Sequence, residues 1–187
     1  MAILRGFGVE RSVGLAQTAW KLGINSVELP IQSDEDVDAL RAVVTAGKAL
    51  GRAVGAGTVV TLEHVRQAAD AGAAFTVSPG FDLEVVRASF EAGMPPLPGV
   101  ATATEVQSAQ TAGLTWVKAF PASILGTSWF GAMRGPFPAM HFVATGGMDA
   151  GNAGEYLNAG AKVVAVGSAL ADRAQLPHLA ALLAARA

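Results

Sequence analysis

The sequence contains no cysteine, so disulfide bonds, cysteine-based zinc sites and a thiolate nucleophile are all excluded. Charged residues make up only 15% of the chain and its net charge is −2, which leaves no basic surface for a nucleic acid. No apolar run reaches the roughly 18–20 residues that a membrane span needs, and the first residues lack the apolar core of a signal peptide. We therefore expect a cytoplasmic protein whose partners include neither nucleic acid nor a membrane.

Small and apolar residues are abundant instead. Hydrophobic residues make up 51% of the chain and 22 residues are glycine, so the chain can fill a large core and pack helices closely on a sheet. Its 187 residues lie below the size, about 250–300 residues, at which a single core splits into two. No linker or low-complexity tract divides the chain. We expect one domain over residues 1–187.

Short apolar runs alternate with longer amphipathic stretches along the whole chain. Eight runs have the length of a buried strand: Ala2–Leu4, Ser26–Pro30, Ala53–Gly55, Phe75–Val77, Leu97–Val100, Leu114–Phe120, Phe142–Ala144 and Val163–Val166. The helix-like stretches between them begin at potential capping residues: Asp34, Thr61, Asp82, Thr102 or Thr104, and Asp149 or Asn152. Several of these stretches end at a glycine of the kind that closes a helix: Gly23, Gly72, Gly93, Gly113 and Gly160.

Eight β/α units of this kind predict an α/β protein, a closed (β/α)8 TIM barrel. Runs that are apolar on both faces are typical of a buried parallel sheet, and the lack of a composition break favours a barrel over an open doubly wound sheet. A dinucleotide-binding fold would need a third glycine after Gly6 and Gly8. The chain is shorter than the about 250 residues usual for barrels, so we expect minimal loops and a less covered barrel bottom.

Two ionisable residues interrupt the apolar runs, and barrel active sites lie at the C-terminal ends of the strands. Lys118 alternates with Trp116 and Phe120 on one face of its run, where apolar surroundings would lower its pKa and make the neutral amine a nucleophile. Glu28 lies at the end of the second run, where desolvation would raise its pKa and suit proton transfer. Together they favour Schiff-base chemistry on a carbonyl, although structural ion pairs also occupy such positions.

Other strand ends carry groups that suit an anionic substrate. Arg5 could bind a carboxylate or phosphate, or form a rim salt bridge. Thr58 could offer its hydroxyl to a substrate or cap the following helix. The last two runs end in Thr145–Gly147 and Gly167–Ser168, where backbone N–H groups at a helix start could bind phosphate, unless these are ordinary tight turns. No cluster of His and carboxylates has metal spacing, so we expect no metal and no cofactor.

Eight blocks of sequence, in order, match those of a known family: Ala2–Gly6, Val27–Ile31, Gly55–Val59, Val77–Gly80, Pro98–Thr102, Val117–Ala122, Thr145–Gly147 and Gly167–Ser168. In these blocks the chain resembles the bacterial 2-keto-3-deoxy-6-phosphogluconate (KDPG) and 4-hydroxy-2-oxoglutarate (KHG) aldolases, including the related 6-phosphogalactonate aldolases. The similarity covers nearly all of the chain.

The resemblance implies a homotrimeric class I aldolase that cleaves a 2-keto-3-deoxy-6-phospho-sugar acid to pyruvate and D-glyceraldehyde 3-phosphate. Lys118 falls on the family's Schiff-base lysine and Glu28 on its proton-transfer glutamate. The remaining matched positions bind the substrate or its phosphate: Arg5, Thr58, Pro79, Phe120 and Thr145 for the substrate, and Gly146, Gly147, Gly167 and Ser168 for the phosphate.

The chain departs from the family pattern in ways that leave its substrate open. Family members often have a helix before the first strand, whereas Met1 here leads almost directly into it. Gln32 stands where many phosphogluconate enzymes have arginine, and Val27–Ile31 resembles the galactonate branch, whereas Thr145 resembles the gluconate branch. A KHG aldolase giving pyruvate and glyoxylate, another phosphate-binding barrel enzyme, and a non-catalytic anion-binding barrel remain alternatives.

Overall fold

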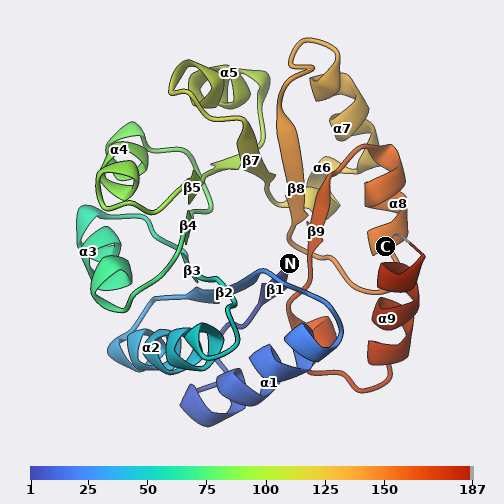
Figure 1. Cartoon of the computed structure of the whole chain (residues 1–187). Helices are drawn as coiled ribbons and strands as arrows, with labels where there is room; N and C mark the ends of the chain where they lie inside the picture. Colours follow the sequence, from blue (N-terminus) through green and yellow to red (C-terminus); the bar gives the residue numbers. More distant parts are fainter. Residues whose placement is uncertain (186–187) are drawn as a thin grey trace.

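The computed structural model describes residues 1–185 and shows a ring of strands surrounded by helices (Figure 1). Every strand pair within the ring is parallel. The strands are β1 Ala2–Ile3, β2 Val27–Pro30, β3 Val54–Gly57, β4 Thr76–Val77, β5 Pro96–Leu97, β6 Gly99–Val100, β7 Trp116–Ala119, β8 His141–Thr145 and β9 Val163–Ala165. They lie within one or two residues of the eight predicted apolar runs, except that the fifth run is divided into β5 and β6.

The ring has two seams: the chain itself spans one, and hydrogen bonds close the other. Strands β1 to β5 form one sheet and β6 to β9 another, and Pro98 separates them because proline has no N–H to continue the ladder. At the other seam, the Ile3 N–H donates to the Val166 carbonyl at 2.9 Å, and the Val166 N–H donates to the Met1 carbonyl at 3.0 Å. Because β5 pairs with β4, β6 pairs with β7 and only Pro98 lies between them, β5 and β6 together form one strand of the barrel. The predicted closed (β/α)8 barrel is confirmed.

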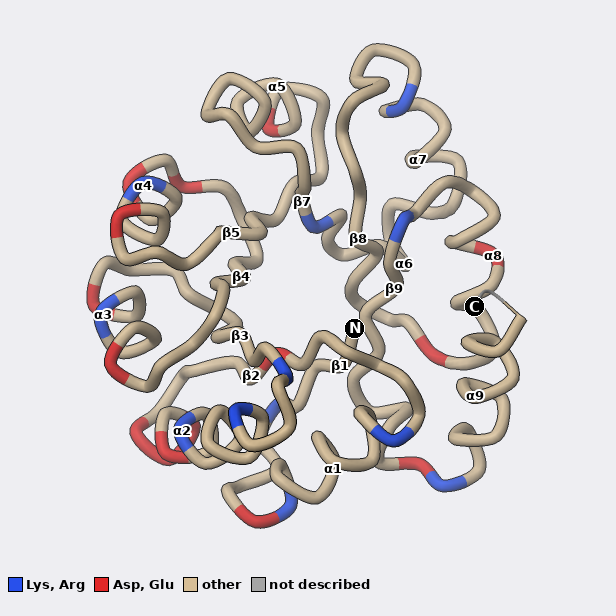
Figure 2. The backbone as a smooth tube through the Cα atoms, in the orientation of Figure 1, with Lys and Arg blue, Asp and Glu red and all other residues tan. Residues whose placement is uncertain are grey.

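Helices cover the outside of the ring. They are α1 Val9–Lys21, α2 Asp34–Lys48, α3 Leu62–Asp70, α4 Leu83–Glu91, α5 Ala103–Thr111, α6 Ala122–Leu125, α7 Thr127–Arg134, α8 Ala153–Ala159 and α9 Leu176–Ala184, with a 3-10 turn, η1, over Ser168–Leu170. Figure 2 shows that charged residues gather on these helices and are sparse on the strands. A charged side chain on a central strand therefore needs a separate explanation.

The predicted helix starts were mostly correct. The hydroxyl of Thr61 accepts from the His64 N–H and the carboxylate of Asp82 from the Val85 N–H, as N-caps do. Thr102, rather than Thr104, caps α5, because Glu105 reciprocates and completes a capping box.

One expected helix start needs correction, and one choice that the sequence left open is decided. Asp34 is the first residue of α2, and its N-cap is Ser33, whose hydroxyl accepts from the Asp36 N–H at 3.3 Å. Asn152, rather than Asp149, occupies the N-cap position of α8. The Asp149 carboxylate instead accepts from the Asn152 N–H in the turn before that helix.

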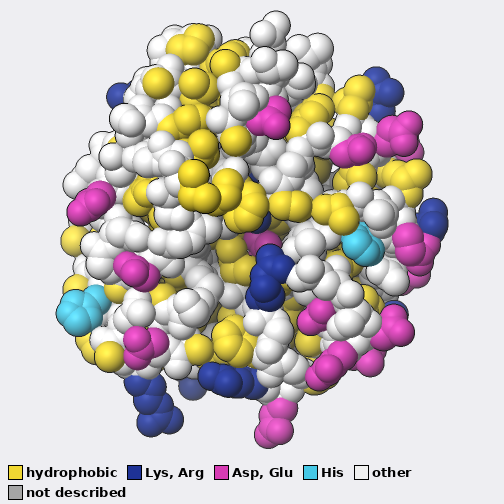
Figure 3. All heavy atoms as spheres, turned by 180° about the vertical axis from the view of Figure 1, so that it is seen from behind, with side chains coloured by type: hydrophobic (Ala, Val, Ile, Leu, Met, Phe, Trp, Pro, Cys, Tyr) yellow, Lys and Arg dark blue, Asp and Glu magenta, His cyan; other side chains and the backbone are white. Residues whose placement is uncertain are grey.

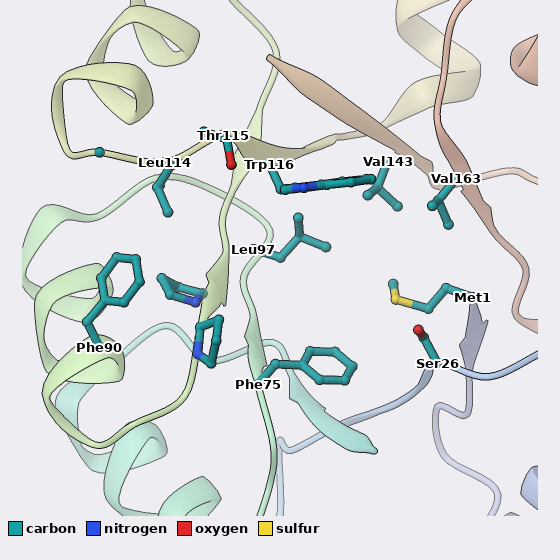
Figure 4. A pocket seen from close by; sticks show the side chains of 13 residues that line it. Met1, Ser26, Phe75, Phe90, Leu97, Leu114, Thr115, Trp116, Val143 and Val163 are labelled. Carbon is teal, nitrogen blue, oxygen red and sulfur yellow. The ribbon is translucent and has the colours of Figure 1, made fainter. Parts of the chain in front are cut away.

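An apolar cavity of about 480 Å³ opens at the N-terminal end of the barrel. Figure 4 shows Trp116, Leu97 and Phe75 directed into it from different strands and loops, with Met1 at its edge. Trp116 lies on the same face of β7 as Lys118, as the alternation predicted, so one strand face serves both ends of the barrel. No helix within residues 1–185 is long and apolar enough to cross a membrane.

Gly99 tests how closely the barrel is packed at the β5–β6 break. A Cβ atom at this residue would lie 2.0 Å from the backbone oxygen of Pro79, which cannot rotate away as a side chain can. We expect Gly99→Ala to lower the free energy of unfolding, measured by urea denaturation, by about 1–3 kcal/mol. Gly14→Ala is the control, because a Cβ there meets nothing within 4 Å on helix α1 and should raise stability by about 1 kcal/mol. Equal effects of the two substitutions would contradict the close approach.

Candidate active site

Lys118 is the third residue of β7 and is buried inside the barrel, with only 4% of its surface exposed. Burial lowers its pKa below the usual 10.5; the carboxylate of Glu28 opposes this shift and the guanidinium of Arg5 adds to it. Its Nζ lies 4.9 Å from the centre of the Phe120 ring. The low pKa increases the fraction of neutral amine, which is the nucleophilic form.

Glu28 is completely buried, and neither of its carboxylate oxygens has a hydrogen-bond partner in the described part of the chain. Burial raises its pKa, while the charges of Lys118, Arg5 and the chain's amino group lower it. It is the second residue of β2, deeper than the strand end where the sequence predicted it. The side chain packs against β3, because a methyl group at Gly57 would lie 2.2 Å from Oε1 of Glu28.

Arg5 follows β1 at the mouth of the barrel and binds two neutral side chains. Its Nη2 donates to the Thr58 hydroxyl at 3.3 Å, and its Nη1 donates to Oε1 of Gln32. Neither alternative that the sequence left open is found: Arg5 forms no salt bridge within residues 1–185, and Thr61 rather than Thr58 caps α3. Arg5 and Thr58 are thus brought together, and Gln32 joins them.

A cavity of about 740 Å³ occupies the C-terminal end of the barrel. A space-filling view from behind Figure 1 shows a hollow at the centre of that face, with basic and acidic side chains in it (Figure 3). Most of the predicted site residues line the cavity: Arg5, Lys118, Phe120, Thr145, Gly146, Gly147, Gly167 and Ser168. Glu28 and Thr58 lie beside it, against Lys118 and Arg5, whereas Pro79 follows β4 at the same end, outside the lining.

The two glycine loops form one wall of this cavity. Gly146 and Gly147 follow β8 with φ angles of 95° and 76°, and Gly167 and Ser168 follow β9. Helix α8 begins only at Ala153, so Gly147 does not open that helix as the sequence suggested. The Gly147 carbonyl instead accepts from the Asn152 side chain at 2.8 Å, which ties the loop to the helix start.

Thr145 contributes a further polar atom without a partner. It is the last residue of β8, it is 2% exposed, and its hydroxyl has no hydrogen-bond partner within residues 1–185. Because Thr145 also lines the cavity, this hydroxyl is available to a ligand there. A buried polar group without a partner is costly, so its presence calls for an explanation such as a bound ligand.

Several lining residues escaped the sequence reasoning: Ile3, Phe7, Met148, Asp149 and Ala165. Phe7 stands between Gly6 and Gly8, which both have positive φ, and this pattern could have indicated a tight loop that turns an aromatic ring toward the mouth. Gln32 was noted only as a departure from a family pattern. No group of three or more metal-ligating side chains was found in the described residues.

Known proteins match both the sequence and the fold. The chain is 39% identical over 150 residues to 2-dehydro-3-deoxy-phosphogluconate aldolase of Treponema pallidum, covering 80% of this chain and 70% of that one. It is 35% identical over 171 residues to a probable 2-dehydro-3-deoxy-6-phosphogalactonate aldolase of Rhizobium meliloti, covering 91% and 80%.

A solved structure of KDPG aldolase from Legionella pneumophila, with pyruvate captured at low pH as a covalent carbinolamine intermediate, superposes with a TM-score of 0.84 at 27% identity. The superposition covers 98% of this chain and 92% of that one. The family model of KDPG and KHG aldolases matches residues 1–182. The buried lysine and glutamate, the cavity and these matches together lead to one conclusion: the chain belongs to the KDPG and KHG aldolase family.

Proposed function

We propose that this protein is a class I aldolase that cleaves a 2-keto-3-deoxy-6-phospho-sugar acid to pyruvate and D-glyceraldehyde 3-phosphate. The observation that carries the proposal is a buried lysine that lines the cavity and a completely buried glutamate without a hydrogen-bond partner inside one barrel. Burial lowers the pKa of the lysine and raises that of the glutamate. Such a pair supplies a nucleophilic amine and a group that can both give and take a proton near neutral pH. The named relatives and the carbinolamine trapped in the Legionella enzyme support the same chemistry.

Lys118 and Glu28 perform the covalent steps in this proposal. The neutral Nζ attacks the C2 ketone carbon, and one proton passes from the nitrogen to the ketone oxygen to give a carbinolamine. A proton from Glu28 then lets the C2 hydroxyl leave as water, which leaves an iminium ion and a Glu28 carboxylate. Glu28 accepts the C4 hydroxyl proton while the C3–C4 bond breaks and its electron pair moves into the iminium. Glyceraldehyde 3-phosphate leaves as the aldehyde. The remaining enamine is protonated at C3, and hydrolysis releases pyruvate and restores Lys118.

The other cavity residues orient the substrate. Arg5 and Thr58 would bind the substrate carboxylate. Phe120 and Pro79 would border the pyruvate portion, and the Thr145 hydroxyl would form a hydrogen bond with a substrate hydroxyl. Backbone N–H groups of the two glycine loops, together with the Ser168 hydroxyl, would bind the phosphate. No metal or cofactor takes part in this proposal, because the iminium ion itself withdraws the electrons of the broken bond.

We further propose a single-domain homotrimer that acts in the cytoplasm. Large apolar side chains such as Ile124, Phe90 and Leu62 are exposed, and contacts between copies of the chain would cover such groups. A substrate with both a carboxylate and a phosphate does not cross a membrane unaided, because moving charges into lipid is costly. Sedimentation of the purified chain measures the oligomeric state directly.

Replacing the lysine tests the central step. Lys118→Met should abolish both pyruvate release, measured by coupled lactate dehydrogenase, and the covalent adduct formed with pyruvate and borohydride, because no other lysine among the described residues lines the cavity. Lys48→Met, at an exposed position on α2, should retain both. Adduct formation on another lysine would overturn the assignment. Parallel assays with gluconate- and galactonate-derived substrates and with 4-hydroxy-2-oxoglutarate identify the preferred substrate.

Glu28→Gln should separate proton transfer from binding. The amide keeps the shape but cannot exchange a proton, so we expect kcat to fall by about 10²–10⁴-fold while KM changes by less than about threefold. Steady-state kinetics with the preferred substrate measures both constants. Glu84→Gln, at an exposed position on α4, is the matched control, and an unchanged kcat in Glu28→Gln would exclude the proposed role.

The lowered pKa of Lys118 predicts a pH dependence for adduct formation. Because burial shifts this pKa below 10.5, trapping of pyruvate by cyanoborohydride should become faster with rising pH and reach half its maximum well below pH 10.5. Nα-acetyl-lysine, whose amine is fully solvated, provides the reference curve and should reach half-maximum near its ordinary pKa of about 10.4. Coincident curves for protein and free lysine would show that burial does not activate the amine.

A further inference from the structure

The positive charge of Arg5 is oriented without being neutralised. Its two hydrogen bonds go to the side-chain oxygens of Gln32 and Thr58, which are both uncharged. No carboxylate lies within salt-bridge distance of Arg5 in residues 1–185. A guanidinium that is held in one orientation by neutral partners can still bind an anion through its charge and its remaining N–H groups.

Gln32 is held in place by the junction between β2 and α2. Its N–H donates to Oδ2 of Asp36 at 3.1 Å, and the same oxygen accepts from the Ser33 hydroxyl at 3.0 Å. Ser33 in turn caps α2, so the backbone of Gln32 is tied to a helix start. Its side chain must present Oε1 to Arg5, because a guanidinium has only donors to offer.

Thr58 holds the other side of the guanidinium from an unusual backbone conformation. Its φ of 58° is the only positive φ of a non-glycine residue in the described part of the chain. Threonine is β-branched and rarely adopts this conformation, and such outliers cluster at sites where a side chain must be held in one direction. Three successive β/α units thus each supply one member of the group Gln32–Arg5–Thr58.

We propose that Gln32 is a positioning residue that aims the Arg5 guanidinium at the carboxylate of the 2-keto acid without pairing its charge, and so selects ketones that carry a carboxylate. The inference rests on the proposed aldolase function. Each Nη atom of arginine has two N–H groups, so one on each remains free after binding Gln32 and Thr58. Two parallel donors of this kind match the two oxygens of a carboxylate.

The position of Arg5 favours the carboxylate over the phosphate as its anion. Arg5 is close enough to influence both Lys118 and Glu28 electrostatically, and the substrate carboxylate is bonded directly to the C2 atom that Lys118 attacks. The phosphate lies at the far end of the substrate. A neutral carboxamide at residue 32 is essential to this arrangement, since a carboxylate there would pair with Arg5 and cancel its charge.

Reductive trapping with cyanoborohydride tests the inference on the full-length protein. Gln32→Ala should raise the half-saturating pyruvate concentration about tenfold, and Gln32→Glu about a hundredfold, because hydrogen bonds and charges around an ionised group are stronger than neutral ones. The maximal trapping rate should change less than about threefold. Trapping of hydroxyacetone, a ketone without a carboxylate, should be unaffected. Gln17→Ala and Gln17→Glu, at an exposed position on α1, are the matched controls.

A merely structural role for Gln32 gives the opposite pattern. Glutamate, which is closest in shape, would then be milder than alanine, and both ketones would be affected alike; either result overturns the inference. Failure of the proposed function looks different, because the unmodified protein would then form no adduct with pyruvate at all. If it forms the adduct and the Gln32 variants saturate at the normal pyruvate concentration, only the positioning role is wrong.

Discussion

The seam between β1 and β9 is the contact on which the active site depends. Ile3 and Val166 join the first and last strands by main-chain hydrogen bonds, and the same Ile3 pairs in register with Glu28 on β2. An open sheet would admit water to Lys118 and Glu28, and both pKa values would return toward those of solvated side chains. The short β1 then leads directly into Arg5, so the strand that closes the ring also delivers the anion-binding group.

Much of this arrangement could be predicted from the sequence, because strand alternation and burial are periodic properties. A lysine among Trp116 and Phe120 must share their face, and glycines after β8 and β9 imply close backbone approach. The depth of Glu28 was not predicted, although the second run was correctly expected to end at Pro30. Depth depends on how far β2 and the neighbouring β3 extend beyond Glu28, and β3 continues to Gly57. The association of Arg5 with Gln32 and Thr58 depends on one backbone angle and on side-chain direction across three loops, which no local pattern encodes.

The groups proposed to act on the substrate lower the stability of the barrel. The unpaired carboxylate oxygens of Glu28 and the unpaired hydroxyl of Thr145 are buried where hydrogen-bond partners would normally be supplied. Such groups persist because the surrounding apolar core, which includes Leu29 on β2 and Phe142 on β8, stabilises the ring enough to tolerate them. Among the described residues, the lining of the apolar cavity at the opposite end includes no such group, although Nε1 of Trp20 on α1 is also buried without a partner and lies outside both cavities.

Gly57 determines where the Glu28 side chain can lie. It has no functional group, yet the missing side chain is what allows the Glu28 carboxylate to lie against β3. In a survey of tolerated substitutions, this glycine should therefore behave like a member of the active site, although it touches no substrate. The position of the Glu28 carboxylate thus depends partly on the absence of a side chain at the neighbouring strand position. A comparison that considers only functional groups would overlook this requirement for glycine.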